Sequence, residues 1–370
     1  MTDAGGAPLV LLAAGGTGGH LFPAEALAAA LAKRGVTVDL ATDHRAERYG
    51  GRFPARETHI IPSDTIRARN PVALARTALA LGRGLMRAYF VLRRIKPAAV
   101  VGFGGYPTLP PVGAATVLKI PTIIHEQNAV MGRANRQLAP HVTAIATSFA
   151  GVLDAEPALA AKATRTGNPV RPAAIAAAST PFAAPEADGL VRLLVFGGSQ
   201  GARIMSEVVP AAIERLDASL RMRLLLAQQA RDEDLARVRD IYARLRIASE
   251  VSPFFPDLPA RIAAAHLVVA RSGASTVAEL AAIGRPSILV PLPGALDQDQ
   301  FANAGVLEAA GGAIRLRQDD FTPARLAAEI TVLTAGPQRL TAMAQAARSH
   351  GAPDAADRLA DLVMKTARLS

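Results

Sequence analysis

The chain has 370 residues, half of them apolar and 19% charged, a composition that excludes intrinsic disorder and allows roughly two globular domains. It contains no cysteine, which excludes disulfide frameworks, thiol nucleophiles, iron–sulfur clusters and cysteine-based zinc sites. Lysine and arginine number 41 against 31 aspartate and glutamate, a surplus that predicts an anionic partner: nucleic acid, a phosphorylated substrate or a lipid headgroup.

The first half opens with a short apolar run at residues 8–14 (PLVLLAA), which is typical of a buried parallel strand. A glycine loop follows at 15–20 (GGTGGH), and an Ala/Leu-rich helix is expected over 22–33. Further strands of this half are expected at 36–41, 98–101, 122–124 and 142–146.

The same arrangement recurs in the second half, with a strand at 190–196, a loop at 197–201 (GGSQG) and a helix at 202–216. The two loops begin 182 residues apart, at Gly15 and Gly197, and further strands are expected at 223–226, 267–270 and 287–291. Strand–helix alternation predicts an α/β chain with two Rossmann-like, doubly wound parallel-sheet domains facing a cleft. We place them at 1–166 and 190–370 with a Pro/Ala/Gly-rich linker at 167–189, and the final helix could pack back on the first domain.

The N-terminus does not resemble a signal peptide, because residues 1–12 carry Asp3 and no basic stretch. No apolar run reaches the ~20 residues that a membrane-spanning helix needs. These features predict a cytoplasmic protein whose membrane contact is peripheral.

The basic surplus is concentrated in residues 66–96, which hold eight basic side chains and no acidic one. A helix there would place Arg76, Arg83, Arg87 and Arg94 on one stripe, opposite the stripe of Leu74, Leu81, Leu85 and Leu92. One interpretation is a surface helix with its leucines directed inward. The other is a segment attracted to anionic lipid; nucleic acid is disfavoured because the segment has few aromatic residues and no binding module.

A glycine loop between a strand and a helix lets backbone amides approach phosphate oxygens. Such a loop can also be a simple tight turn, but two at equivalent places favour phosphate recognition. Neither has the G-x-G-x-x-G spacing of dinucleotide enzymes, and the strand that follows the second loop helix (RLLLAQQ) ends without an acidic residue. Asp39 and Asp43 leave NAD binding open in the first half.

Histidine side chains offer two candidate sites. His20 begins the first helix, where the helix dipole disfavours imidazolium, so it is either a general base or a packing histidine. A second polar cluster, HEQN at 125–128, follows a strand; the zinc pattern H-E-x-x-H fails because Ala129 occupies the last position. We therefore expect no metal.

Two further motifs follow strands of the second half. RSGASTVAEL (271–280) contains Thr276 and Glu279, which would form either a capping box or a carboxylate that binds ribose hydroxyls. The DQDQ segment at 297–300 resembles the start of a calcium loop, but Phe301 and Ala302 stand where a ligand and glycine belong. It suits sugar hydroxyls better, or is a solvated loop.

Taken together, the ordered motifs GGTGGH (15–20), GFGGYP (102–107), HEQN (125–128), TGNPVR (166–171), GGSQGA (197–202) and RSGASTVAEL (271–280) resemble the MurG family of glycosyltransferases. The resemblance extends from about residue 9 to 304. It implies a GT-B fold and metal-independent, inverting transfer of N-acetylglucosamine from UDP-N-acetylglucosamine to the C4 hydroxyl of lipid I, giving lipid II in peptidoglycan synthesis. It further implies a peripheral enzyme on the cytoplasmic side of the bacterial inner membrane, with other cell-wall synthesis proteins as further partners.

The C4 hydroxyl must lose a proton as it attacks, and His20 is the candidate general base with Glu126 the runner-up. The resemblance assigns further residues. The residues implied in substrate binding are Thr17, Gly18, Gly19, Tyr106, Asn128, Arg171, Ser199, Phe255, Ala274, Ser275, Thr276, Glu279 and Gln300. The family often carries a Gln-Gln pair where this chain has Asp299-Gln300, so the role of Asp299 is open; membrane-facing tryptophans of some members are absent.

Three alternatives remain at this point: a GT-B glycosyltransferase with another acceptor, an NAD-dependent oxidoreductase, and a non-catalytic sugar-binding protein. The loop spacing disfavours the second, and the missing export signal disfavours the third.

Overall fold

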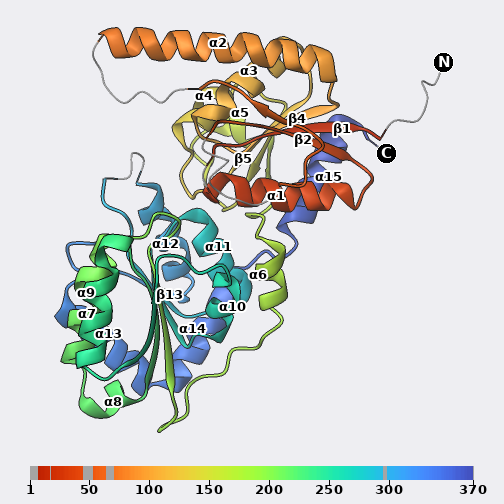
Figure 1. The fold of residues 1–370 in the computed structure, drawn as a ribbon. Coiled ribbons are helices and arrows are strands. Elements are labelled where there is room, and N and C mark those ends of the chain that lie inside the picture. Colours follow the sequence, from red (N-terminus) through yellow and green to blue (C-terminus); the bar gives the residue numbers. More distant parts are fainter. Residues whose placement is uncertain (1–6, 17, 45–52, 64–70, 295–297, 370) are drawn as a thin grey trace. The chain divides into compact units, whose positions relative to one another are not determined.

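A computed structural model describes residues 7–16, 18–44, 53–63, 71–294 and 298–369; for 71–78 it describes the backbone only. The chain divides into two compact units (Figure 1). Unit 1 comprises residues 1–171 and 353–370, and unit 2 comprises residues 172–352. The chain therefore passes into unit 2 after Arg171, inside the segment expected as a linker, and its last residues belong to unit 1.

Unit 1 contains a parallel sheet of seven strands in the order β3-β2-β1-β4-β5-β6-β7. These are β1 (Leu9–Ala13), β2 (Thr37–Thr42), β3 (Thr58–Ile60), β4 (Ala99–Gly102), β5 (Thr122–Glu126), β6 (Ala144–Thr147) and β7 (Ala163–Arg165). Its helices are α1 (Gly18–Ala32), α2 (Pro71–Ile95), α3 (Leu109–Val117), α4 (Arg133–Leu138), α5 (Pro157–Ala160) and α15 (Ala355–Ala367), with a 3₁₀ turn at Tyr106–Thr108.

The central strand β1 shows why its sequence is apolar throughout. Val10 and Leu12 pack with α1 and α15 on one face, whereas Leu11 and Ala13 pack with α2 and α3 on the other. Because successive side chains of a strand point to opposite faces, a strand covered by helices on both sides needs an unbroken apolar run.

Unit 2 repeats the plan with six parallel strands in the order β10-β9-β8-β11-β12-β13. The strands are β8 (Val191–Phe196), β9 (Leu224–Gln229), β10 (Ala248–Ser252), β11 (Leu267–Ala270), β12 (Ser287–Leu289) and β13 (Ala313–Arg315). The helices are α6 (Pro172–Ala177), α7 (Arg203–Arg215), α8 (Ala218–Met222), α9 (Asp232–Arg244), α10 (Leu258–Ala264), α11 (Ala274–Ile283), α12 (Asp299–Ala309), α13 (Pro323–Ala335) and α14 (Pro337–Ser349). Two doubly wound parallel-sheet domains are thus confirmed.

Candidate active site

In unit 1, His20 lies between two glycine loops at the beginning of α1. A side chain at Gly15 would place its Cβ 3.2 Å from the His20 Nδ1, and one at Gly105 would lie 3.3 Å from the imidazole Cε1. Gly105 also has φ +76°, a conformation that favours glycine. Two glycine loops therefore leave room for a half-buried imidazole at the N-terminus of a helix.

Other residues that the sequence predicts in substrate binding lie on the same loops. Gly18 and Gly19 are the first two residues of α1, whereas Thr17 lies outside the described residues. Tyr106 begins the 3₁₀ turn directly after Gly105 and is half-buried.

Glu126 ends β5 and is 1% exposed. Its Oε1 accepts hydrogen bonds from the Asn128 backbone N (2.9 Å) and Nδ2 (3.2 Å). Its Oε2 accepts from the Gly132 N (3.0 Å) and the Asn135 Nδ2 (2.8 Å). Burial raises the pKa of Glu126, although these four donors oppose the increase. A carboxylate with this many donors holds Asn128 and the loop in place, which favours His20 over Glu126 as the base.

His125 is completely buried and its pKa is lowered to about 4 by burial, so the imidazole is neutral near pH 7. Its Nε2 lies 3.0 Å from the Gly167 carbonyl oxygen and donates to it. His125 therefore links β5 to the turn that leads toward Arg171.

Arg171 is the last residue of unit 1 before the chain enters unit 2. Its guanidinium carbon lies 4.5 Å from the ring centroid of Phe22, which follows His20 on α1 after one intervening residue. Cation–π stacking of this kind directs Arg171 toward the first turns of α1.

In unit 2, the glycine loop at 197–201 is held by β9. The Gln229 Oε1 accepts from the Gly197 N (2.9 Å), and its Nε2 donates to the Gly198 carbonyl (3.1 Å). A Cβ at Gly197 would lie 2.3 Å from the Ala202 N, so only glycine fits there. Ser199 is exposed at the tip of this loop, just before α7.

The motif at 271–280 forms the start of α11. Its N-cap is Gly273, so Ala274, Ser275 and Thr276 are the first three helical residues. The capping-box interpretation of Thr276 and Glu279 is therefore wrong, because Thr276 lies inside the helix and does not cap it. Glu279 is 4% exposed on the next turn of the helix.

Gln300 lies in the first turn of α12, beside the start of α11. Its Oε1 accepts from the Leu292 N (3.1 Å), and its carbonyl oxygen accepts from the Ser272 hydroxyl (2.8 Å). The Asp299 Oδ1 accepts from the Gln300 N at 2.8 Å, which gives Asp299 a role in the first turn of this helix. These bonds tie the two helix N-termini together.

Phe255 follows β10 and is 5% exposed beneath the Arg261 guanidinium, 4.3 Å from its ring centroid. The preceding Phe254 is 62% exposed. Sequence reasoning did not single out Phe254, nor Gln229, whose amide joins the glycine loop to the Pro253 carbonyl at 3.1 Å. The available signal was the position of Gln229 at the end of a parallel strand.

Asp39, considered above as a ribose acid, is not available for a nucleotide. It is completely buried within β2, where Arg56 donates to both carboxylate oxygens at 3.0 and 2.9 Å and the His59 Nε2 lies 2.9 Å away. Asp39, Glu57 and His59 form the one group of side chains in the described part of the chain whose atoms could hold a metal ion. Because Arg56 occupies both Asp39 oxygens, the cluster is an ion-pair network.

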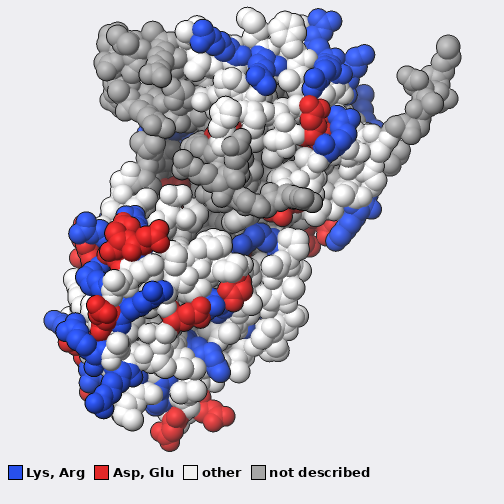
Figure 2. Space-filling view, viewed as in Figure 1, with Lys and Arg blue, Asp and Glu red and all other residues white. Residues whose placement is uncertain are grey.

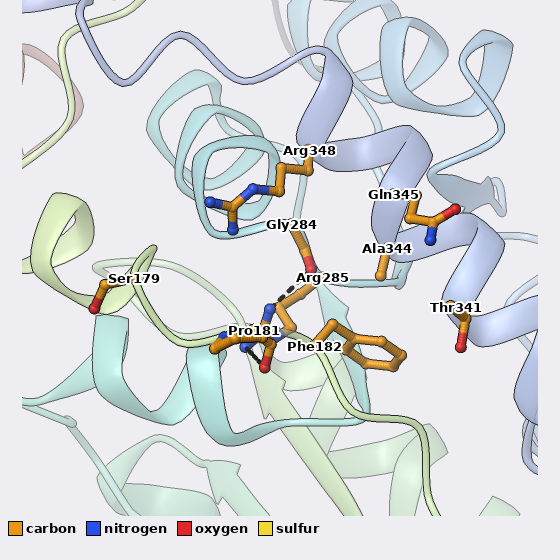
Figure 3. A pocket seen from close by; sticks show the side chains of 9 residues that line it. All are labelled: Ser179, Pro181, Phe182, Gly284, Arg285, Thr341, Ala344, Gln345 and Arg348. Carbon is orange, nitrogen blue, oxygen red and sulfur yellow. Dashed lines mark hydrogen bonds between the residues drawn. The ribbon is translucent and has the colours of Figure 1, made fainter.

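A cavity of about 320 Å³ lies near the amino end of β12, whereas the glycine loops lie at the carboxyl ends of the strands (Figure 3). The Arg285 side chain lies at its wall, 1% exposed, and donates to the carbonyls of Ala263, Ile283, Gly284, Thr180 and Pro181. Burial lowers the pKa of Arg285 to about 10, with a further contribution from Arg348. This arrangement anchors residues 180–181 to two helix C-termini and lies away from the loops described above.

Two family models match this chain. The model for the glycosyltransferase family 28 N-terminal domain matches residues 10–147, and the model for its C-terminal domain matches residues 192–359. The chain belongs to glycosyltransferase family 28.

Relatives in this family cover nearly the whole chain. One from Rhodopseudomonas palustris (strain BisB18) is 67% identical over 98% of this chain and 97% of the relative; one from Nitrobacter hamburgensis is 65% identical over 98% of each. Both are named UDP-N-acetylglucosamine–N-acetylmuramyl-(pentapeptide) pyrophosphoryl-undecaprenol N-acetylglucosamine transferase.

Solved structures agree with this family 28 assignment. MurG of Acinetobacter baumannii aligns with a TM-score of 0.78 at 30% identity, over 97% of this chain and 99% of that one. A complex of S. aureus MnaA with UDP aligns with a TM-score of 0.68 at 13% identity, over 98% of each chain, and shares the fold alone. The predicted MurG resemblance and GT-B fold are confirmed.

Proposed function

We propose that this family 28 enzyme transfers N-acetylglucosamine from UDP-N-acetylglucosamine to the C4 hydroxyl of lipid I, giving lipid II for peptidoglycan synthesis. The observation that carries the proposal is the similarity, at 67% identity over 98% of the chain, to relatives named for this reaction. The loops at the carboxyl ends of both sheets supply the chemistry that the reaction needs.

Unit 2 is the proposed donor half. Glu279, buried on α11, would accept hydrogen bonds from the ribose hydroxyls, and the backbone near Phe255 would face the uracil. Ser199 with the loop amides, together with Arg171 of unit 1, would contact the diphosphate. Asn128, Gln300 and the first turn of α11 would surround the N-acetylglucosamine.

Unit 1 is the proposed acceptor half, with Tyr106 on the acceptor side and Thr17–Gly19 where the two substrates would meet. His20 would take the proton of the C4 hydroxyl as that oxygen attacks the anomeric carbon. The bond from this carbon to the diphosphate oxygen breaks, and UDP leaves with the bonding electron pair. A positioned base of this kind accelerates reactions by about 10²–10⁴-fold.

The transfer is proposed to need no metal cofactor. Negative charge develops on the departing diphosphate, and the N-terminus of α7 directs unpaired amides and positive potential toward it. Among the described residues, no side chain caps this helix start and none in its first turn is acidic, which supports phosphate binding there.

Helix α2 is the proposed membrane contact. Leu79, Met86 and Phe90 are 56%, 64% and 64% exposed and are spaced at i, i+7 and i+11, on one stripe. Arg83, Arg87 and Arg94 lie three or four residues from members of this stripe and are exposed as well. Figure 2 shows basic side chains gathered over unit 1 near this helix. Apolar side chains flanked by arginines suit the headgroup region of an anionic bilayer.

The leucine stripe expected from the sequence is only partly correct. Leu92 is buried, but Leu85 is 41% exposed, and Phe90 gives the exposed stripe an aromatic side chain. Arg67 and Arg69 lie outside the described residues, as do the side chains of Leu74 and Arg76. Among the helices of the described residues, we find no candidate for a membrane-spanning segment. We place the enzyme peripherally on the cytoplasmic face of the inner membrane.

The test is UDP release from UDP-N-acetylglucosamine by the purified chain in the presence of a lipid I analogue. The proposal expects UDP release only when the muramyl acceptor is present. Release with a different acceptor and none with lipid I would instead support another family 28 transferase, and a change of NADH absorbance would support an oxidoreductase.

A further inference from the structure

At the 197–201 loop of unit 2, backbone amides alone would balance only part of the negative charge of a bound diphosphate. A diphosphate that leaves without metal carries several negative charges, whereas a helix N-terminus contributes about half of one positive charge. A cationic side chain beside the loop would supply the remainder.

Arg231 lies against this loop. It follows β9 by one intervening residue, and a Cβ at Gly201 would lie 3.0 Å from the Arg231 Cγ and 3.8 Å from its Nε. Gly201 has φ +65° and stands directly before the N-cap of α7. The same end of β9 holds the loop through Gln229, so the position of Arg231 is set by the strand that shapes the loop.

The Arg231 guanidinium has a hydrogen-bond donor without an acceptor among the described residues. Its Nε is buried and finds no hydrogen-bond acceptor among the described residues. Its one ion pair in that part of the chain is with Glu233 at 3.7 Å, and that carboxylate is 67% exposed. At this distance and exposure the pair contributes little.

Two other arginines, Arg203 and Arg271, donate hydrogen bonds to groups of the protein itself. Arg203 donates to Glu207 at 2.7 Å. Arg271 is buried and donates to the carbonyls of Val290 and Pro291 and to the Gln318 side chain. Burial lowers the pKa of Arg271, and the charge of Arg231 lowers it further, so the two cations lie close enough to repel. An anion between or beside them would relieve this repulsion.

We propose that Arg231 is a donor-binding residue whose guanidinium contacts the diphosphate of the nucleotide sugar and stabilises it as it leaves. This inference rests on the proposed function, which places that diphosphate at the 197–201 loop. It assigns to the loop a cation from unit 2 itself, in addition to Arg171 of unit 1.

The experiment compares binding of UDP and of uridine to the full chain by calorimetry. Arg231→Met keeps the aliphatic stem on Gly201 and removes the charge, and Arg231→Lys keeps a charge. Loss of a charge-assisted hydrogen bond should raise the Kd of UDP about tenfold in Arg231→Met and leave the Kd of uridine unchanged. Arg231→Lys should restore part of the UDP affinity. Arg203→Met, which removes the same charge from a committed arginine, is the matched control.

Equal losses of UDP and uridine affinity, or the same loss of UDP affinity in Arg203→Met, would contradict the assignment, because either result indicates a general effect on the fold or the field. Wild-type UDP affinity in Arg231→Met would overturn it while leaving the proposed function intact. Failure of the wild-type chain to bind UDP would overturn the proposed function itself.

Discussion

At the scale of single residues, His20 has the position that a general base needs. It lies in the first turn of α1, where the helix dipole disfavours imidazolium, and the glycines at 15 and 105 leave room around the ring. We expect His20→Ala to lower kcat by about 10²–10⁴-fold while the Kd of UDP-N-acetylglucosamine changes little. His141→Ala, an exposed histidine of the same unit, is the control. A parallel loss of donor affinity and turnover would make His20 a binding residue instead.

A substitution at Glu279 tests whether unit 2 binds the nucleotide of the donor. Gly273 rather than Thr276 is the N-cap of α11, and Glu279 is 4% exposed on this helix, where we propose that its carboxylate binds the ribose hydroxyls. Glu279→Gln preserves the shape of the side chain and removes its charge, and two weakened charge-assisted hydrogen bonds should raise the Kd of uridine by about tenfold or more. The midpoint of thermal unfolding, measured alongside, reports whether the fold is kept. An unchanged uridine Kd would remove Glu279 from the site.

The hydrogen bonds of the buried Asp39 carboxylate predict how the stability of the fold depends on pH. Burial raises the pKa of the Asp39 carboxyl, but hydrogen bonds from Arg56 and His59 outweigh it and hold the pKa below its usual range. A lowered pKa stabilises the fold above the unfolded pKa of about 4, and this contribution is lost as the pH falls through the folded value. Asp39→Asn should therefore lower the urea midpoint at pH 7, and the difference from wild type should narrow below about pH 4. A pH-independent difference would contradict this account.

At the scale of elements, the sequence predicted the central strands and missed those at the edges. Strands β3, β7, β10 and β13 are the outer strands of the two sheets, and none was expected. They are short or polar, as in THI (58–60) and ASEVS (248–252), because an edge strand buries less of its surface. The sequence predicted that both glycine loops lie between a strand and a helix, and the structure places them there. The residues that support these loops, such as Gln229 for the 197–201 loop, could not be predicted because they come from strands distant in sequence.

The arginines of helix α2 are expected to bind anionic membranes. Replacing Arg83 and Arg87 by glutamate should weaken binding to anionic vesicles by about 30-fold or more, since each basic residue near such a surface contributes about 1 kcal/mol. Turnover of a soluble acceptor should persist. Reversal of two exposed arginines of unit 2, Arg215 and Arg244, is the matched control. Vesicle binding equal to wild type would refute the membrane assignment.

At the scale of the whole molecule, the two similar halves explain why length and glycine-loop spacing predicted two domains. The return of the chain is harder to read from sequence. Helix α15 belongs to unit 1, where Leu359 and Val363 join the core beside α1 and Arg34 pairs with Asp357 and Asp361 at 3.0 and 2.9 Å. The sequence predicted this return only as one option, because an amphipathic pattern shows that a helix has an apolar face but not which sheet covers that face.

The most direct test of the central claim is the stereochemistry of the product. Purified protein is incubated with α-linked UDP-N-acetylglucosamine and a lipid I analogue in excess EDTA, and the disaccharide is analysed by NMR. We predict a β(1→4) linkage, formed with one UDP per disaccharide and at a rate that EDTA does not change. An α-linked product, or a reaction that stops with EDTA and resumes with added metal, would contradict it.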